Sequence, residues 1–202
     1  MMYVKICGLK HNSDIEHVNT LLPDFVGFIF AKNSKRYVTP KEAAELKERL
    51  DKRIKAVGVF VDAELEFVAE IVSQGIIDII QLHGKEDNSY IRSLREDMGI
   101  LKPIIKAVSV SSIEDLSSAM ESEADMILFD NGPGGTGKSF NWAQVAGFNR
   151  PFILAGGLSA DNVATAIKAC KPFAVDTSTG VETEGRKDFN KIQEFITTAR
   201  RA

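Results

Sequence analysis

The stretch that decides the fold is "PFILAGGLSADNVATAIKACKPFAVDTSTG", residues 151–180. It contains two short apolar runs, at 152–157 and 173–178, which are typical of strands buried on both faces. Between them, residues 159–170 repeat apolar side chains at the spacing of one helix face. A strand, a crossover helix and a second buried strand predict two parallel strands of one sheet.

The same pattern of an apolar strand followed by an amphipathic helix runs through the whole chain. Eight strands are expected, at 3–7, 25–30, 55–61, 78–83, 104–108, 126–130, 152–157 and 173–178. Eight helices are expected, at 12–22, 39–50, 63–75, 88–99, 111–122, 141–148, 159–170 and 188–201. Eight βα units in 202 residues predict an α/β protein with a single (β/α)8 TIM barrel domain over residues 1–202. A doubly wound open sheet is the structural alternative.

Composition narrows the classes of partner. A formal net charge of -3 with 26% charged residues argues against nucleic-acid binding, which needs a concentrated basic surface. No apolar run approaches the length of a membrane span, so we expect no membrane partner and a cytoplasmic protein. The two cysteines, Cys7 and Cys170, are too few for a disulfide framework, and neither stands in a metal-ligand spacing.

One motif suggests a different function. "NGPGGTGKSFNW", residues 131–142, contains the nucleotide-binding pattern G-x-x-x-x-G-K-[ST] between Gly132 and Ser139. A phosphate-binding loop of that kind needs a helix that starts at its Lys-Ser pair, whereas Asn141 is the more natural N-cap here. The match also follows the sixth of eight strands. We therefore interpret it as a coincidental glycine-rich loop, with an ATP- or GTP-binding protein as the alternative.

In a (β/α)8 barrel, functional side chains lie at the C-terminal ends of the strands. Cys7, His83, Asp130 and Asp176 stand at four such ends and are candidates to converge. Carboxyl groups at apolar strand ends are costly, which favours a functional interpretation of both aspartates. Cys7 alone is equally consistent with a small buried hydrophobic residue, and His83 with a structural histidine.

Two strand lysines leave a further alternative open. Lys5 and Lys106 are possible Schiff-base lysines, but barrel interiors also place lysines in charge pairs. Nothing in the sequence distinguishes between the two lysines or between the two roles.

The loops after the last two strands suggest an anion site. Gly156 and Gly157 follow the seventh strand, and Ser178 and Gly180 follow the eighth. Small residues there let backbone N–H groups approach a phosphate, in the two loops where barrels often bind one. Arg36, in the loop after the second strand, is suited to hold a carboxylate bidentately. The pattern predicts a phosphorylated small-molecule substrate.

The chain closely resembles the phosphoribosylanthranilate isomerase family of tryptophan biosynthesis over nearly its whole length. The resemblance rests on "KICG", "SKRYV", "VGVFV", "QLHG", "GGTGKSFNW", "AGGL" and "FAVDTSTGVE", in that order. Asn141 and Thr179 depart from the family pattern.

The resemblance implies an Amadori rearrangement of N-(5-phosphoribosyl)anthranilate, with no metal or redox cofactor, in a monomer or homodimer. It implies that Asp130 is the general acid and Cys7 the general base. Nearby positive charge is expected to lower the pKa of the Cys7 thiol. Arg36 would bind the substrate's carboxylate, and His83 and Asp176 would line the site. The phosphate would meet backbone groups around Gly156, Gly157, Ser178 and Gly180.

Two rival functions share the barrel architecture. Another phosphosugar enzyme, such as a ribulose-phosphate epimerase or an indole-glycerol-phosphate synthase, is one alternative. An epimerase would need metal-ligating histidines at strand ends, and His83 is the only histidine so placed in the sequence. A catalytically silent phosphometabolite-binding barrel is the other, but it would not need Cys7 together with Asp130.

Overall fold

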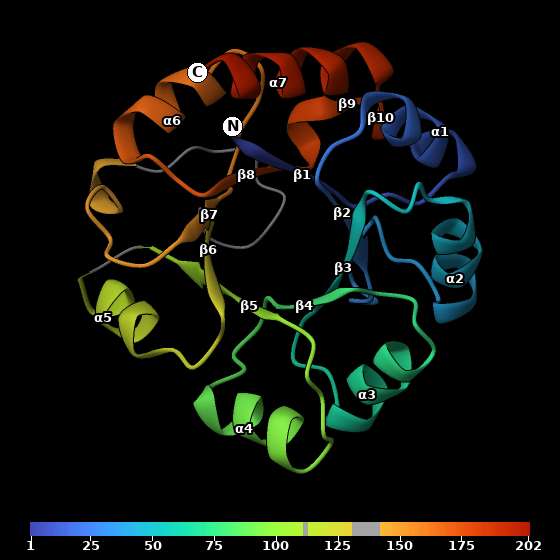
Figure 1. The fold of residues 1–202 in the computed structure, drawn as a ribbon, viewed down its shortest axis with the longest axis vertical. Helices are drawn as coiled ribbons and strands as arrows, with labels where there is room; N and C mark the ends of the chain where they lie inside the picture. Colours follow the sequence, from blue (N-terminus) through green and yellow to red (C-terminus); the bar gives the residue numbers. More distant parts are fainter. Residues whose placement is uncertain (111–112, 131–141) are drawn as a thin grey trace.

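The fold is a closed parallel barrel. The structure, a computed structural model, describes residues 1–110, 113–130 and 142–202. Eight strands pair in sequence order, and β1 pairs with both β2 and β8, which closes the ring seen in Figure 1. The strands are β1 Tyr3–Cys7, β2 Phe25–Ile29, β3 Lys55–Phe60, β4 Ile79–Leu82, β5 Ile104–Ser109, β6 Met126–Asp130, β7 Phe152–Leu154 and β8 Ala174–Thr177. The predicted (β/α)8 barrel is confirmed, and the open sheet is wrong.

Seven α-helices among the described residues surround the ring (Figure 1). They are α1 Asn12–Leu21, α2 Pro40–Arg49, α3 Leu65–Ser73, α4 Asn88–Glu96, α5 Ile113–Glu121, α6 Val163–Cys170 and α7 Phe189–Arg201. Helix α2 begins where the sequence marks its start: the Thr39 hydroxyl accepts from the N–H of Glu42, whose carboxylate accepts from the N–H of Thr39.

Alternation along each strand separates two hydrophobic layers. In β6, Ile127 and Phe129 belong to the core between the strands and the helices, whereas Leu128 belongs to a smaller cluster inside the barrel. Asp130 is two residues beyond Leu128 and therefore faces the interior. The same alternation places Lys5 and Cys7 of β1, Gln81 of β4, His83 just after β4, and Asp176 of β8 on the inner side.

The segment between β6 and β7 differs from its prediction. A helix was expected over 141–148, but the described residues form only a three-residue 3-10 turn, η1 Trp142–Gln144. Gly147 follows with φ +88, which an α-helix does not accept, so helical geometry ends there. The nucleotide-loop match at 132–139 lies outside the described residues. It falls between two strands of a closed barrel, which is not the open sheet of a nucleotide-binding domain.

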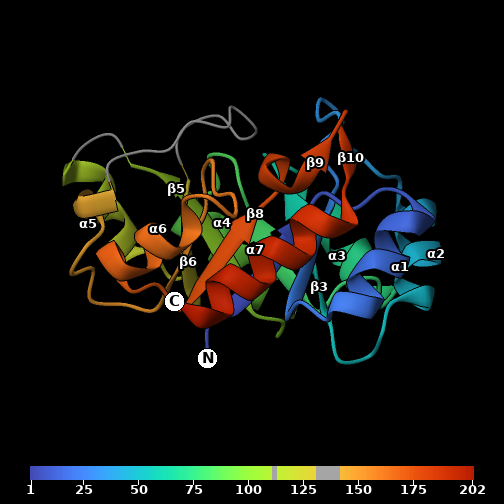
Figure 2. The same cartoon turned by 90° about the horizontal axis from the view of Figure 1, so that it is seen from above.

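After β8 the chain forms a short addition that was not predicted. A 3-10 turn, η2 Thr179–Val181, leads into an antiparallel hairpin of β9 Glu182–Thr183 and β10 Arg186–Lys187. Glu184 and Gly185 at its tip have φ of +52 and +77, the combination that a tight two-residue hairpin turn requires. In Figure 2 this hairpin lies at the rim opposite the N-terminus, the rim where the barrel strands end.

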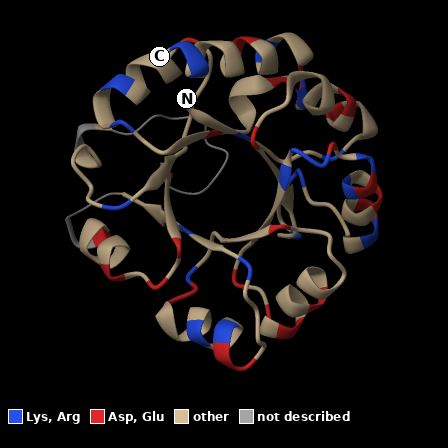
Figure 3. Ribbon diagram, viewed as in Figure 1, with Lys and Arg blue, Asp and Glu red and all other residues tan. Residues whose placement is uncertain are grey.

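Charged residues lie mainly on the outer helices and loops, as Figure 3 shows, and the two chain ends lie close together in Figures 1 and 2. A few charged positions fall on the strand ring itself. Within the described ranges, no helix is long and apolar enough to cross a membrane.

Candidate active site

A cavity of about 350 Å³ opens at the C-terminal rim of the barrel. It is lined by Cys7, Ile29, Ala31, Lys32, Asn33, Ser34, Arg36, Val59, Val61, Gln81, His83, Asp130, Asp176 and Ser178. The structure therefore brings together the two residues predicted as catalytic, the three predicted to bind the substrate, and Ser178. Gly156, Gly157 and Gly180 stand in the loops that follow β7 and β8.

Cys7 ends β1 and is 6% exposed. Burial raises the pKa of its thiol, and the positive charges of Lys5 and Lys187 offset this in part. The expected positive charge is therefore present, but the expected lowering of the thiol pKa is wrong. The physical reason is desolvation, which disfavours the charged thiolate more than the two ammonium groups favour it.

Lys5 lies beneath the cavity and is fully buried. Its Nζ is 3.1 Å from Oδ2 of Asp176. Burial acts to lower the pKa of Lys5, but its interactions with Asp176 and Cys7 outweigh burial and raise it. A protonated amine is not a nucleophile, so this arrangement speaks against Lys5 as a Schiff-base lysine.

Lys106 is held in a different place. Its Nζ donates to the carbonyl oxygen of Gly84 at 2.6 Å and to Oε2 of Glu86 at 3.1 Å. The same Glu86 carboxylate accepts from the N–H groups of Asp62 and Gly84. Lys106 therefore forms a charge pair and is not placed as a Schiff-base lysine. Its contacts fix the loop after β4 that carries His83.

His83 connects two other groups of the cavity. Its Nε2 is 3.4 Å from Oδ2 of Asp130, and its Nδ1 is 2.9 Å from the amide nitrogen of Gln81. With the amide in this orientation Nδ1 accepts, so the proton of a neutral ring sits on Nε2 and faces the carboxyl group. Gln81 is 1% exposed, and its position fixes the imidazole.

Arg36 is held by a residue that the sequence analysis did not single out. Its Nε and Nη2 donate to the two carboxylate oxygens of Glu182, each at 2.6 Å. Lys187 also donates to Glu182, at 2.7 Å, and to the carbonyl oxygen of Ser178, at 2.9 Å. The Glu184-Gly185 pair between Glu182 and Lys187 could have indicated this arrangement. A glycine in a two-residue turn favours a hairpin, which places the residues on either side of the turn next to each other.

The loops after β7 and β8 are packed against each other. The Thr177 hydroxyl donates to the carbonyl oxygen of Leu158 at 2.7 Å. A Cβ on Gly180 would overlap the same carbonyl, so only glycine fits there. Asn162 fixes the first loop by donating to the Gly157 carbonyl and accepting from the N–H of Ser159. Gly156 and Gly157 have φ of +81 and +66.

Chemically, the cavity offers a buried thiol, a carboxyl group beside a histidine, and cations on its rim. This set can move protons to and from a bound anion. Among residues 1–110, 113–130 and 142–202, no group of three or more His, Cys, Asp or Glu side chains is arranged to hold a metal ion.

Comparisons with known proteins agree on one family. Residues 4–198 match the model of the N-(5'phosphoribosyl)anthranilate (PRA) isomerase family. An N-(5'-phosphoribosyl)anthranilate isomerase of Thermoanaerobacter sp. (strain X514) is 45% identical over 206 residues, covering 99% of this chain and 98% of the relative. The isomerase of Clostridium acetobutylicum is 43% identical, covering 100% of this chain and 99% of that one.

Solved structures give the same result. The phosphoribosyl anthranilate isomerase of Thermotoga maritima superposes with a TM-score of 0.91 at 36% identity, with full coverage of both chains. A phosphoribosyl anthranilate isomerase in complex with reduced 1-(o-carboxyphenylamino)-1-deoxyribulose 5-phosphate superposes with a TM-score of 0.88 at 35% identity, again over 100% of both chains.

Proposed function

Because the chain belongs to the N-(5'-phosphoribosyl)anthranilate isomerase family, we propose that Cys7 is the general base and Asp130 the general acid of the family's reaction. The enzyme is an aldose-ketose isomerase of tryptophan biosynthesis. It converts N-(5-phosphoribosyl)anthranilate to 1-(2-carboxyphenylamino)-1-deoxyribulose 5-phosphate, the third step from chorismate. The observation that carries the assignment is the shared cavity, which Cys7 and Asp130 line from β1 and β6.

The proposed mechanism consists of two proton transfers followed by a tautomerisation. Asp130 donates a proton to the furanose ring oxygen, whose bond to the anomeric carbon breaks to give a Schiff base. The Cys7 thiolate then removes the proton from C2′, and the electron pair of that C–H bond forms an enolamine. Tautomerisation gives the ketone, so atoms and electrons balance without an external reactant. Because only protons move, we propose that no metal or redox cofactor takes part.

The electrostatics of the cavity support this division of roles. Lys5 and Lys187 place positive charge near the Cys7 sulfur, which favours its thiolate once the proton has left. His83 lies against Asp130 and can orient its carboxyl group toward the substrate. Asp176 holds Lys5 in place and also lines the cavity.

The ends of the substrate have separate binding groups in this proposal. Arg36 meets the carboxylate of the anthranilate ring. The phosphate meets backbone N–H groups of the packed loops around Gly156, Gly157, Ser178 and Gly180. We also propose a cytoplasmic location, since a catalytic thiol must stay reduced.

A coupled fluorescence assay tests the function. A transferase makes phosphoribosylanthranilate in place from anthranilate and phosphoribosyl pyrophosphate, and the loss of substrate fluorescence is followed after this protein is added. We expect rapid loss that continues when a chelator is added together with this protein, after the substrate has been made. No loss with folded protein and active transferase would contradict the proposal. Loss that stops with chelator would leave the isomerase reaction in place but overturn its metal-free mechanism.

A further inference from the structure

A charged cluster on the rim includes Glu182, to which no role in the proposed reaction has been given, and its partner Lys187. Glu182 and Lys187 stand on the two strands of the β9–β10 hairpin, which lies at the C-terminal rim of the barrel (Figure 2). Their side chains are 8% and 2% exposed, which is unusual for charged groups on a short surface hairpin. Both are turned toward Arg36 and Ser178 instead of toward solvent.

The contacts of Glu182 use one edge of the Arg36 guanidinium. That group has five N–H bonds in a planar fork, and Glu182 takes Nε and Nη2. The edge formed by Nη1 and the second N–H of Nη2 can still donate two hydrogen bonds to another carboxylate. Arg36 can therefore hold Glu182 and a ligand carboxylate at the same time, on different edges.

The Arg36 side chain is also held from below. Gly8 follows β1 with φ +81, and a Cβ on it would overlap Cδ of Arg36. The aliphatic part of the arginine thus lies directly on the β1 backbone, while Glu182 fixes its head. A mobile arginine side chain loses rotamer entropy when it binds a ligand. Fixing the side chain in advance removes much of that cost.

The charges of the cluster leave it attractive to anions. Burial acts to raise the pKa of Glu182, but hydrogen bonds from Arg36 and Lys187 outweigh it and lower the pKa, so the carboxylate stays ionised. Burial lowers the pKa of Lys187, and the Glu182 carboxylate acts against this lowering. When Lys187 is protonated, one carboxylate between two cations leaves one positive charge in excess. Lys187 extends the cluster to the carbonyl of Ser178, in the loop proposed to bind phosphate.

We propose that Glu182 is a positioning residue that aims the free edge of Arg36 at the substrate's aromatic carboxylate. Through Lys187 it also links the carboxylate end of the site to the phosphate loop. This inference rests on the proposed role of Arg36. The competing possibility is that Glu182 only occupies Arg36 and has to be displaced by the substrate.

Two ligands separate these possibilities. One is reduced 1-(o-carboxyphenylamino)-1-deoxyribulose 5-phosphate, and the other is the same compound made from aniline, which lacks the carboxylate. Calorimetry measures both dissociation constants. The constant of the aniline compound divided by that of the carboxylate compound isolates the contribution of the carboxylate. Changes in phosphate binding affect both ligands and cancel in the ratio.

We expect Glu182→Gln to reduce this ratio about tenfold, since a charge-assisted bidentate contact on Arg36 is lost. Glu182→Asp keeps the charge but is one methylene shorter, so it should also reduce the ratio if geometry is what matters. It serves as the second variant if Glu182→Gln does not fold. An unchanged or larger ratio in these variants would overturn the inference, and a larger one would identify Glu182 as a competitor.

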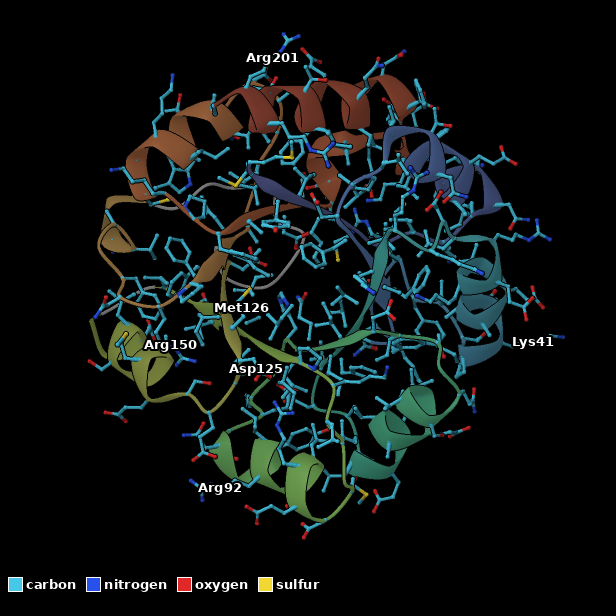
Figure 4. The ribbon with its side chains drawn as sticks, viewed as in Figure 1. Lys41, Arg92, Asp125, Met126, Arg150 and Arg201 are labelled. Atoms are coloured by element: carbon cyan, nitrogen blue, oxygen red, sulfur yellow. The ribbon has the colours of Figure 1, made fainter. Side chains whose placement is uncertain are left out.

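The control and the Arg36 variant keep the outcomes separate. Glu123 also pairs with an arginine through both carboxylate oxygens, but Arg92 lies on the outside of α4 (Figure 4). Glu123→Gln should leave the ratio unchanged. If wild type binds both ligands equally and Arg36→Met changes nothing, the proposed role of Arg36 fails. If Arg36→Met abolishes discrimination but Glu182→Gln does not affect it, only the role of Glu182 fails.

Discussion

The Nζ of Lys5 lies 3.1 Å from Oδ2 of Asp176 inside the barrel, where the lysine side chain is fully buried and the aspartate side chain is 9% exposed. Both members of this pair interact with the Cys7 thiol. The other oxygen of Asp176, Oδ1, has no hydrogen-bond partner among the described residues. The Lys5 ammonium, which favours the Cys7 thiolate, is therefore held by one oxygen of Asp176. The other oxygen of Asp176 has no partner in the described part of the chain.

Removing the lysine should leave Asp176 buried and uncompensated. We expect Lys5→Met to lower the free energy of unfolding by about 3 kcal/mol, within the range for breaking a buried ion pair. Chemical denaturation measures this change. Lys47→Met is the matched control, because Lys47 pairs with Asp78 near the surface, and it should cost less than about 1 kcal/mol. Equal losses in the two variants would contradict a special role for the buried pair.

The pH dependence follows from the environment of Cys7. The proposed base works only as a thiolate, and burial raises the pKa of its thiol. The fraction of Cys7 present as thiolate should therefore rise only at a pH above the range in which a free thiol ionises. The ultraviolet absorbance of the thiolate, followed against pH as the difference between wild type and Cys7→Ala, measures this directly. A Cys7 thiol that ionises below the range of a free thiol would contradict the effect of burial.

Contact between the two phosphate loops gives a third prediction. Gly180→Ala should push the loops apart, because the new Cβ meets the Leu158 carbonyl. We expect a loss of about 2 kcal/mol in unfolding free energy and weaker inhibition by inorganic phosphate. Gly75→Ala is a useful control: its φ is +70 but no atom lies within 4 Å of the added Cβ. It should cost about 1 kcal/mol of backbone strain and leave phosphate inhibition unchanged.

The barrel and most of its mouth could be predicted because both depend on local patterns. Buried strands alternating with amphipathic helices define the fold, and period-2 alternation puts Cys7 and Asp130 on its inner face. The roles of Glu182 and Lys187 depend on a hairpin that brings them back over Arg36, 146 positions earlier in the case of Glu182. Contacts at that separation leave no periodic trace in a single sequence.

The helix expected over 141–148 and the expected lowering of the Cys7 pKa were both wrong. The helix expected over 141–148 has the right composition, but Gly147 adopts a positive φ that ends helical geometry. The pKa of Cys7 depends on a balance between burial and two cations, one on β1 and one on β10. Sequence spacing indicates the cations but not the degree of desolvation, and here desolvation is the larger effect.

The central claim, that Cys7 and Asp130 form the acid-base pair, is tested most directly by their removal. Turnover of phosphoribosylanthranilate should fall at least about a hundredfold in Cys7→Ala and in Asp130→Asn. Calorimetry should show that both variants still bind the reduced product. Cys170→Ala is the matched control, because Cys170 is also 6% exposed but lies on α6, outside the cavity. Normal turnover in either cavity variant would contradict the account.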